Sequence, residues 1–356
     1  MMLATANRFG VVTRRRVLSG AGAAALAGTL PFRSAHAAEA LVATMYGGEM
    51  ERGWRRNVVD PFEKRFNAAV TIATGTSLDN LAKMRAQKND PQIDVVCMDP
   101  IAAIPAANEG LYEELDRSRI PVIDDLYDWA VSKYHLSWLS VYYGLCYNTK
   151  KIKEPTSWND LWNPAYKGHV IFPDISNGGS TLMMHVFNTI AGGDTNRNEV
   201  KAGWERVKSL KPQILTFWTS HDQVAQLLSQ GDAWIAPWPT DRLLTLKAQG
   251  APVGIVIPKE GVPFSQSEIG IAKGSKHREL AEKYINFALS PEQQKKNSET
   301  IWIGPTNKKV QLAPELAKDL GVNPPPGTVR IPVPDWGRIA AYREEWINWW
   351  NREIRG

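Results

Sequence analysis

The sequence predicts an α/β protein, in which strands and helices alternate along the chain. Short apolar runs alternate with longer segments whose apolar residues recur at helical spacing, which is the pattern of a largely parallel sheet covered by helices. The 356 residues, of which 43% are hydrophobic and 22% charged, have the composition of an ordinary globular protein. This length is enough for two domains, each with its own core.

The N-terminal part of the chain contains three expected strands, each followed by a helix. The strands are expected at residues 41–46, 70–74 and 93–98. The helices are expected at residues 54–66, 78–87 and 101–109. Pro61 predicts a kink or a break inside the first helix, and Ser77 is of a type that caps the start of the second. Gly110 is expected to end the third helix.

The rest of the chain continues this alternation. Strands are expected at residues 142–148, 169–172, 234–238, 253–257 and 267–272. Helices are expected at residues 181–190, 200–210, 222–230, 278–289 and 336–354. We find no internal repeat, so the pattern favours one α/β architecture throughout.

Residues 1–37 have the features of an export signal and not of a folded domain. Arginines at 14–16 give a basic start, residues 20–30 form a short, weakly apolar run, and Ala35-His36-Ala37 is an A-x-A cleavage site. The arginines before a weak apolar run favour a twin-arginine signal. An ordinary secretory signal is the alternative, because Val17 stands where twin-arginine signals commonly have Phe. We expect cleavage after about Ala37 and a soluble product outside the cytoplasm.

The basic character of the chain lies in this leader. The chain has 42 Lys and Arg against 37 Asp and Glu, and residues 1–37 contain five arginines and no acidic residue. Without these five, 37 basic residues face 37 acidic ones, so the rest of the chain has no formal net charge. Composition therefore gives no electrostatic case for a nucleic-acid or anionic-lipid partner.

The sequence favours a protein that is not an enzyme and needs no metal or cofactor. It contains no G-x-S-x-G, P-loop or HExxH motif, and its histidines are scattered. The two cysteines, Cys97 and Cys146, lie in apolar runs without CxxC or Cys/His spacing. Two buried thiols are the simpler interpretation, and a disulfide is the alternative that an oxidising compartment permits.

Three segments resemble a known family of transport receptors. SWNDLWNPAYKG at 157–168, PKEG at 258–261 and INFALSPE at 285–292 are similar, in order and spacing, to segments of the solute-binding proteins of spermidine/putrescine-type ABC importers (extracellular solute-binding protein family 1). The resemblance implies a type II periplasmic binding protein, with two lobes that are each a mixed sheet flanked by helices and a ligand cleft between them. It implies lobe 1 at 38–147 plus 265–305 and lobe 2 at 148–264 plus 306–356.

In such a fold the ligand binds at the carboxyl ends of strands, where helices begin. Tyr46, Gly47, Gly48 and Glu49 follow the first strand, and the glycines permit either a close approach of the ligand to the backbone or a plain tight turn. Asp99 follows the third strand and either binds an ammonium group or caps the next helix.

The second lobe supplies further candidates. The polar loop that contains Ser180 and Thr181 precedes a helix, and is either a cradle for a carboxylate or a flexible loop. The resemblance aligns Trp238 and Tyr143 with aromatic residues of the polyamine receptors' cleft. The other candidates of this lobe are Asp174, Asp241 and Arg242.

The chain departs from the family at the acidic residues that hold the amines of a polyamine. After PKEG, those receptors carry a Trp and then an Asp, where this chain has Ser265 and Ser267, with Glu268 one place further on. The acidic anchor that follows Asp174 in the family is replaced by a Ser/Gly-rich loop. Fewer acidic partners favour a ligand with fewer positive charges or with a carboxylate.

This departure leads to a hypothesis about the ligand, namely an ω-amino acid, another zwitterion or a small acid. Asp99 or Glu268 would hold a cationic end, and Ser180, Thr181 or Arg242 would meet an anionic end. We therefore expect a monomeric periplasmic receptor of an ABC transporter that closes by hinge motion on a small polyamine-related, nitrogenous or carboxylate-bearing solute and delivers it to a membrane permease.

Other functions stay open at this point. A ferric-ion receptor is one alternative, because Tyr142 and Tyr143 are an adjacent tyrosine pair. A receptor for a small organic acid and, less favoured, a secreted enzyme are the others. A receptor that presents its ligand to a sensor, in place of a permease, would have the same sequence features.

Overall fold

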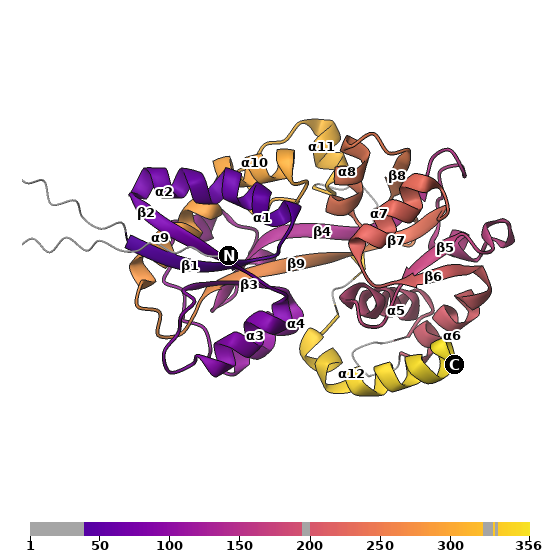
Figure 1. Ribbon diagram of the computed structural model, residues 1–356, viewed down its shortest axis with the longest axis horizontal. Coiled ribbons are helices and arrows are strands. Elements are labelled where there is room, and N and C mark those ends of the chain that lie inside the picture. The colour runs from indigo at the N-terminus through magenta and orange to yellow at the C-terminus, as the bar shows by residue number, and fades with distance from the viewer. Residues whose placement is uncertain (1–38, 194–199, 323–329, 332–333) are drawn as a thin grey trace, which may run out of the picture. The chain divides into compact units, whose positions relative to one another are not determined.

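The computed structural model describes residues 39–193, 200–322, 330–331 and 334–356. They belong to one compact unit that begins at Ala38, and the expected export signal lies outside the described residues. A ten-stranded sheet runs through this unit in the order β2-β1-β3-β9-β4-β7-β5-β6, with β10 beside β9 and β8 beside β4 (Figure 1). Helices pack on both faces of the sheet, so the α/β class expected from the sequence is confirmed.

The first part of this sheet, here called half-sheet 1, is β2-β1-β3-β9-β4. Its strands are β1 (Glu39–Met45), β2 (Ala68–Thr74), β3 (Val95–Met98), β9 (Val262–Ile271) and the first half of β4 (His135–Asn148). β1 is parallel to β2 and β3, whereas β9 runs antiparallel between β3 and β4. Figure 1 shows β9, in orange, among these N-terminal strands, so a late segment of the chain completes the first core.

Helices cover both faces of half-sheet 1. They are α1 (Glu49–Trp54), α2 (Asp60–Phe66), α3 (Ser77–Ala86), α4 (Pro100–Asn108) and α9 (Arg278–Ala288). One hydrophobic core cluster joins α1, α2 and α9 to the sheet, and another joins α3 and α4 to it. The apolar positions that predicted these helices are therefore the ones that the core buries.

Of the kink or break expected at Pro61, the break is absent, and the cap expected for α3 is wrong. The chain does not break at Pro61, because a π-helical turn (Arg55–Val59) joins α1 to α2 just before that residue. Such a turn accommodates the backbone hydrogen bond that a proline cannot make. The cap of α3 is Thr76 and not Ser77, since the Thr76 hydroxyl and the Asp79 carboxylate form a capping box.

The second part of the sheet, here called half-sheet 2, is β4-β7-β5-β6, with β8 beside β4. Its further strands are β5 (Val170–Pro173), β6 (Ile214–Trp218), β7 (Ile235–Pro239) and β8 (Val253–Val256). β5 is parallel to both β6 and β7. The sequence pattern missed β6, because Ile214–Trp218 is only partly buried and shows no clear alternation.

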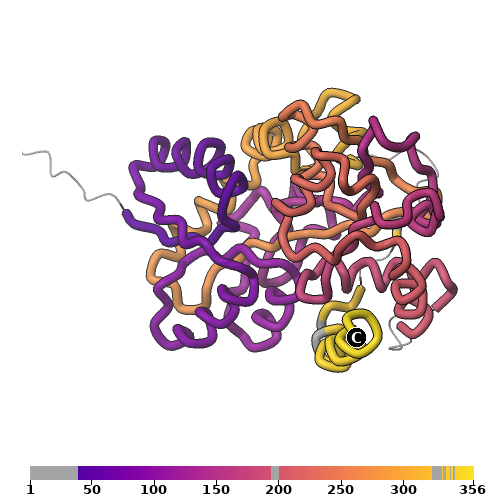
Figure 2. The backbone as a smooth tube through the Cα atoms, turned by 45° about the vertical axis from the view of Figure 1, so that its right-hand side comes forward, coloured from indigo at the N-terminus to yellow at the C-terminus, as the bar shows by residue number. Residues whose placement is uncertain are grey.

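Helices also cover both faces of half-sheet 2. One core cluster joins α5 (Gly178–Ile190), α6 (Lys201–Leu210) and α12 (Trp336–Trp350) to the sheet. A second cluster joins α7 (His221–Gln230) and α8 (Thr240–Ala248) to it. Figure 2 shows α12, in yellow, at the lower edge of the described unit, where Trp346 and Trp349 contact Trp204 of α6.

Two long strands belong to both half-sheets. β4 pairs with β9 from His135 to Tyr142 and then with β7 from Tyr143 to Tyr147. Both β4 and β9 are longer than the strands expected at 142–148 and 267–272. The residue boundaries of the two lobes stay a prediction. The remaining elements are α10 (Pro291–Thr300), α11 (Pro314–Asp319) and β10 (Arg330–Ile331).

The two cysteines are free thiols in different core clusters, Cys97 in half-sheet 1 and Cys146 in half-sheet 2. Burial raises the pKa of both thiols, so they are unreactive at neutral pH. Of the helices in the described part of the chain, none combines the length and the apolar character needed to cross a membrane.

Candidate functional site

Six helices begin where parallel strands end, three in each half-sheet. In half-sheet 1 the strands β1, β2 and β3 lead into α1, α3 and α4, and in half-sheet 2 the strands β5, β6 and β7 lead into α5, α7 and α8. Ligands of open α/β sheets bind outside such carboxyl ends. We call these two sets of junctions edge 1 and edge 2, and they contain the candidate site residues.

Edge 1 contains a hydrogen-bonded group of Tyr46, Ser77, Asp99 and Ser267, here called the Asp99 cluster. The Tyr46 hydroxyl donates to Asp99 Oδ1 at 2.7 Å, and its oxygen lies 2.7 Å from Ser267 Oγ. Ser77 Oγ donates to Asp99 Oδ2 at 3.0 Å and accepts from the Asp99 backbone N–H at 2.9 Å. Residues from three strand ends and from β9 thus converge on one carboxylate.

Local helix capping explains why this carboxylate is available. Asp99 occupies the N-cap position of α4, but its side chain makes no capping hydrogen bond. Ser77 is likewise free of a capping role, because Thr76 caps α3. Of the two roles that the sequence left open for Asp99, the structure therefore does not use helix capping.

Electrostatics make the Asp99 cluster receptive to a cation. Burial, followed by the charge of Glu268, raises the pKa of Asp99 above its ordinary value. Burial and the Asp99 carboxylate also raise the pKa of Tyr46. Among the described residues no Lys, Arg or His forms an ion pair with Asp99. A bound ammonium group would supply the missing positive partner.

Glu268 does not belong to this cluster. Its carboxylate accepts from Ser137 Oγ at 3.0 Å and lies 3.1 Å from His135 Nδ1. Because Glu268 follows Ser267 in β9, the two side chains point to opposite faces of the strand. Ser265 lies two residues before Ser267, on the same side of β9, and is partly exposed.

Edge 2 brings Tyr143 to the start of α5. A Cβ atom on Gly179 would lie 2.9 Å from Tyr143 Cε1 and 3.0 Å from its hydroxyl oxygen, so the ring packs against a helix turn that only glycine permits. Asn177 caps this helix by accepting from the Gly179 N–H at 2.8 Å. Burial, then Asp241, then Asp99 raises the pKa of Tyr143, so the charges of acids from both edges act on this side chain.

The start of α8 supplies a charged pair, and the end of β7 an unexpected core residue. Asp241 Oδ2 lies 3.4 Å from Arg242 Nε, with about a third of the arginine side chain exposed. Trp238 is 1% exposed inside a core cluster, and its indole N–H donates to His221 Nδ1 at 3.0 Å. The resemblance predicts that Trp238 lines the ligand cleft. In this structure its side chain instead packs against α7 and α8.

Arg343 of α12 is a residue that sequence reasoning missed. Its guanidinium donates to Thr181 Oγ1 at 3.5 Å and to the Ile175 carbonyl at 3.3 Å, both beside the start of α5. Burial lowers the pKa of Arg343, and no carboxylate of the described residues pairs with it. No sequence signal could have revealed this, because α12 lies more than 150 residues after the helix that it meets.

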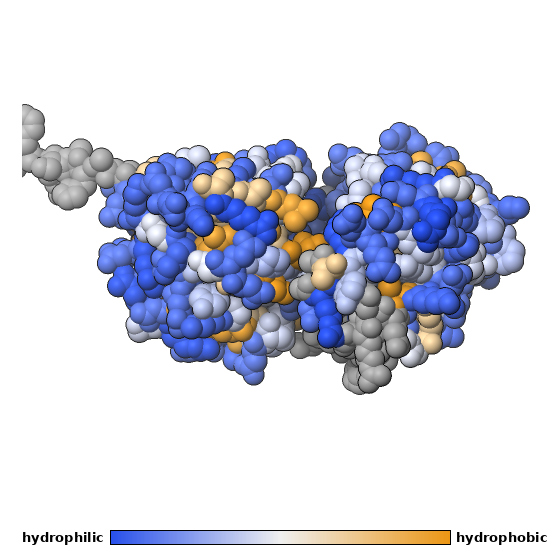
Figure 3. Space-filling view, turned by 90° about the horizontal axis from the view of Figure 1, so that it is seen from below, coloured by the Kyte–Doolittle hydropathy of each residue, from blue (hydrophilic) through white to orange (hydrophobic). Residues whose placement is uncertain are grey.

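α12 also meets half-sheet 1. Ile101 and Ile104 of α4 pack against the core cluster that contains Trp336 and Ile339 of α12. Figure 3 shows the face that carries α3, α4 and α12, which is mostly hydrophilic, with hydrophobic side chains gathered near the middle of the view. The C-terminal helix therefore links the two halves of the described unit.

Several expected site residues have structural partners instead. Asp174 pairs with Arg355 at 2.8 Å and accepts from the Ser176 N–H at 3.0 Å. Ser180 is fully buried and donates to the Asn177 carbonyl at 2.9 Å. At the start of α1, Glu49 is exposed and pairs with Arg52.

The loop before α1 is open to solvent. Gly47 and Gly48 have no heavy atom within 4 Å of where a Cβ would stand. Gly48 has φ +75°, a left-handed conformation that suits glycine, so it serves the turn into α1. The tight-turn interpretation therefore accounts for Gly48, and the open space beside both glycines leaves room for a ligand.

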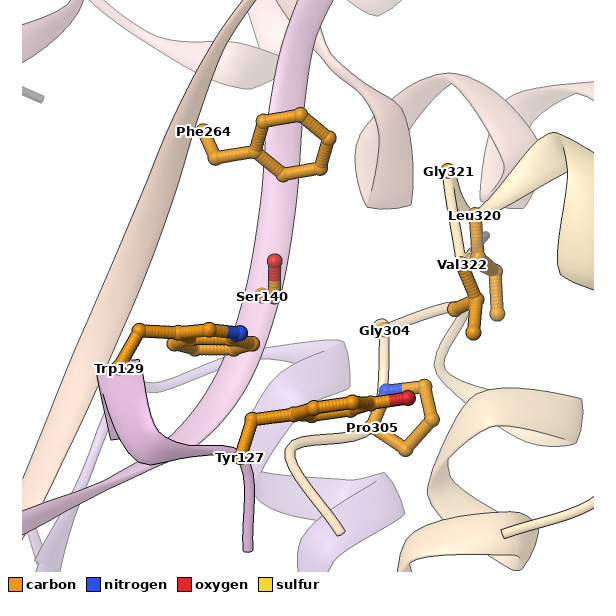
Figure 4. Close-up of a pocket in the computed structure, with 9 residues that line it drawn as sticks. All are labelled: Tyr127, Trp129, Ser140, Phe264, Gly304, Pro305, Leu320, Gly321 and Val322. Atoms are coloured by element: carbon orange, nitrogen blue, oxygen red, sulfur yellow. The ribbon is translucent and has the colours of Figure 1, made fainter. Parts of the chain in front are cut away.

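A small cavity of about 70 Å³ lies on the other face of the β4–β9 pair (Figure 4). Its lining includes Ser140 and Phe264, together with the stacked rings of Tyr127 and Trp129. Ser140 alternates with Tyr143 along β4, and Phe264 alternates with Ser267 along β9, so these two lining residues point away from the Asp99 cluster. The cavity contains none of the expected site residues.

The fold and the two facing sets of strand–helix junctions define a class of protein, the two-lobed solute-binding proteins. Residues 57–324 match the bacterial extracellular solute-binding protein family, and the chain belongs to that family. Its members bind small molecules and work with ABC transporter permeases. The resemblance and the two-lobed fold expected from the sequence are thereby confirmed.

Individual relatives lie at moderate sequence distance. The spermidine/putrescine-binding periplasmic protein of Escherichia coli K12 is 26% identical over 285 residues, which cover 77% of this chain and 81% of that protein. The γ-aminobutyric acid (GABA)-binding protein of Pseudomonas aeruginosa is 25% identical over 300 residues, covering 79% and 81%. A crystal structure of an ABC transporter from Clostridium perfringens has a TM-score of 0.73 and 28% identity, covering 88% of this chain and 99% of that one.

Proposed function

We propose that the chain is a periplasmic receptor that captures a small ω-amino acid, or a similar zwitterion, and delivers it to a membrane permease. The observation that carries this proposal is the division of charge between the edges. Edge 1 offers the Asp99 carboxylate among hydroxyls, whereas edge 2 offers Arg343 beside the start of α5 and Arg242 at the start of α8. A molecule with an amine at one end and a carboxylate at the other matches both.

The ammonium end would bind the Asp99 cluster. Asp99 already accepts hydrogen bonds from Tyr46 and Ser77, which leaves lone pairs free for a further donor. Its pKa is raised because the buried charge lacks a positive partner. Binding an ammonium group would remove that penalty, and it would favour the charged form of Asp99.

The carboxylate end would bind near the start of α5. The two hydrogen bonds of Arg343 leave most of its five N–H donors unused. The first backbone N–H groups of α5 point the same way as the helix dipole, which favours an anion. Tyr143 packs on this turn and lies between the two ends.

The relatives support this ligand class. The P. aeruginosa relative is named for GABA, which has one amine and one carboxylate, whereas the E. coli relative is named for polyamines. A polyamine needs an acidic or aromatic partner for each positive charge. Of the expected acidic residues, Glu268 and Asp174 are occupied by protein partners, which favours the zwitterion.

A diamine is the second candidate, and Asp241 is the observation that favours it. Asp241 and Asp99 both raise the pKa of Tyr143, so one acid from each edge could hold an amine on either side of that ring. Arg242 opposes this arrangement, because its guanidinium lies 3.4 Å from Asp241. Iron is less well supported, because Tyr142 donates to the Asp319 carbonyl while its neighbour Tyr143 points to the opposite face of β4.

The remaining parts of the proposal rest on the leader sequence, the composition and the strands that both half-sheets share. We infer an exported, monomeric protein that closes by bending of β4 and β9, the strands shared by both half-sheets. Export by the twin-arginine route, cleavage after about Ala37 and the absence of a cofactor or nucleic-acid partner belong to this proposal.

Calorimetric titration tests it directly. The protein is unfolded in denaturant and refolded to release any ligand that copurified with it, then titrated with GABA, putrescine and butyrate. We expect GABA to bind best, because only GABA engages both edges. A ligand at 100 times its Kd should also add about 2.7 kcal/mol to the free energy of unfolding, visible as a rise in Tm. Tight putrescine binding without GABA binding would overturn the proposal in favour of a diamine receptor.

A further inference from the structure

His221 is the first residue of α7 and follows the carboxyl end of β6 at edge 2. Its Nδ1 atom lies 3.0 Å from the indole nitrogen of Trp238. An indole N–H can only donate, so Nδ1 has to be the acceptor and carries no proton. The neutral ring therefore carries its proton on Nε2, and Trp238 fixes which tautomer is present.

The surroundings keep this ring neutral. It packs between the rings of Trp218 and Trp238, with centroid distances of 5.4 and 6.2 Å. Burial, and then the charge of Arg242, lowers the pKa of His221 to about 4, and Asp241 opposes this only in part. Arg242 and Asp241 on α8 are the charged groups that act on the ring, and Asp222 is the next residue of α7 itself.

The other ring nitrogen is open. His221 is partly exposed, and in the described part of the chain no hydrogen bond engages its Nε2 atom. The ring stands beside Arg242, at a helix start on the same sheet edge as α5 and α8. A partly exposed, oriented N–H donor next to a cationic side chain is a suitable partner for an anion.

We propose that His221 binds the anionic end of the ligand through its Nε2–H, and that Trp238 is the positioning residue that fixes this tautomer. This inference rests on the proposed zwitterion function. Trp238, which the resemblance aligned with an aromatic residue of the cleft, would therefore act on the ligand only through His221. Binding would also be independent of histidine protonation across neutral pH, since the donor is the neutral ring.

The test uses the full chain with GABA as the probe, in calorimetric titrations from pH 5.5 to pH 8. For the wild type we expect an affinity that does not rise as the pH falls. His221→Phe should weaken GABA binding about tenfold by removing one hydrogen bond to a charged group. His169→Phe is the matched control, because that ring stacks on Trp234 at the opposite end of β5 and should leave the affinity unchanged.

Trp238→Phe gives a readout that a merely structural role would not change. Without the indole donor, Nδ1 can take a proton, so the pKa of His221 should rise and GABA affinity should now increase below about pH 6. If this variant does not fold, ¹⁵N NMR of the wild-type histidines replaces it. We expect an unprotonated Nδ1, a protonated Nε2, and an Nε2 signal that moves when GABA is added.

Either of two results would overturn the inference. One is unchanged GABA affinity in His221→Phe, and the other is an Nε2 signal that GABA does not move. Both require that the wild type binds GABA. If the wild type does not bind GABA or another ω-amino acid, the proposed function fails, and this is a different result from a wild type that binds without using His221.

Discussion

The hydroxyl of Tyr46 lies 2.7 Å from the Asp99 carboxylate and donates a hydrogen bond to it, which joins the end of β1 to the end of β3. Ser267 of β9 adds its hydroxyl to the same group from 221 residues further along the chain. A single carboxylate is thus oriented by three hydroxyl side chains from separate strand–helix junctions and from a strand that both half-sheets share. This arrangement holds the charge in place without neutralising it, which is what a receptor for an ammonium group requires.

Asp99→Asn should weaken GABA binding by about 10- to 100-fold. The amide cannot supply the charge that an ammonium group needs, and a hydrogen bond to a charged group contributes about 1.5–3 kcal/mol. Asp90→Asn is the matched control, since Asp90 is an exposed acid that pairs with Lys276. Calorimetric titration of both variants measures the difference. Equal affinities for wild type and Asp99→Asn would place the ammonium site elsewhere.

The same substitution should stabilise the ligand-free protein at neutral pH. The pKa of Asp99 is raised in the folded state, so the folded chain binds this proton more tightly than the unfolded chain. Its contribution to stability is therefore greatest below the unfolded pKa of about 3.9 and is lost as the pH rises through the folded pKa. Asp99→Asn should raise Tm at pH 7 and leave Tm nearly unchanged at pH 4. A lower Tm at pH 7 would contradict this.

Gly179→Ala should disrupt edge 2, whereas Gly178→Ala should not. The new Cβ on residue 179 would stand 2.9 Å from the Tyr143 ring, while residue 178 has no atom within 4 Å of that position. Overpacking of this kind costs about 1–3 kcal/mol, or else displaces the Tyr143 ring from the start of α5. Thermal unfolding and GABA titration of the two variants measure both effects. Equal stability and equal GABA affinity in Gly179→Ala and Gly178→Ala would show that the position of Tyr143 does not depend on its contact with Gly179.

Arg343→Gln should lower the affinity for GABA but not for putrescine. The guanidinium is proposed to meet the carboxylate of the ligand, which putrescine lacks. Arg338→Gln, on the same helix but exposed, is the control. Titration of both ligands against both variants gives the ratio of GABA affinity to putrescine affinity. A general loss of stability would not change this ratio. A parallel loss of GABA and putrescine binding in Arg343→Gln would indicate a structural role for this arginine.

Arg355→Gln should reduce stability and leave ligand affinity unchanged. Arg355 pairs with Asp174 at 2.8 Å, and this arginine is about half exposed, so the pair should contribute about 0.5–1 kcal/mol at pH 7. The pKa of Asp174 is lowered in the folded state, chiefly by hydrogen bonds from Ser176 and Arg355 that outweigh burial. This stability is present above pH 4 and is lost as the pH falls through the folded pKa. Denaturant unfolding at pH 7 and pH 3 measures the stability that the Asp174–Arg355 pair contributes. A change in GABA affinity in Arg355→Gln would indicate that Asp174 takes part in ligand binding.

The sequence predicts five of the six strands whose carboxyl ends form the candidate site. Its apolar runs correspond to β1, β2, β3, β5 and β7, and the polar residues just after them include Tyr46, Asp99 and Asp241. The sequence indicates Ser77 only as a helix cap, because capping preference is local and the contact with Asp99 is not. Nothing in the sequence distinguishes His221 from the other scattered histidines, since its partner Trp238 lies 17 residues further along the chain, on β7.

What the sequence determined by itself was the α/β class, the family and most of the elements, because periodicity and short motifs act over a few neighbouring residues. Only the tertiary structure decided which candidate groups meet. It buried Trp238 in a core cluster and placed Arg343 of α12 at the start of α5. It also paired Asp174 with Arg355 and Glu268 with His135. The reason is physical, since the availability of a charged or polar side chain depends on its partners and its burial. Both are fixed by contacts between residues that lie far apart in the chain.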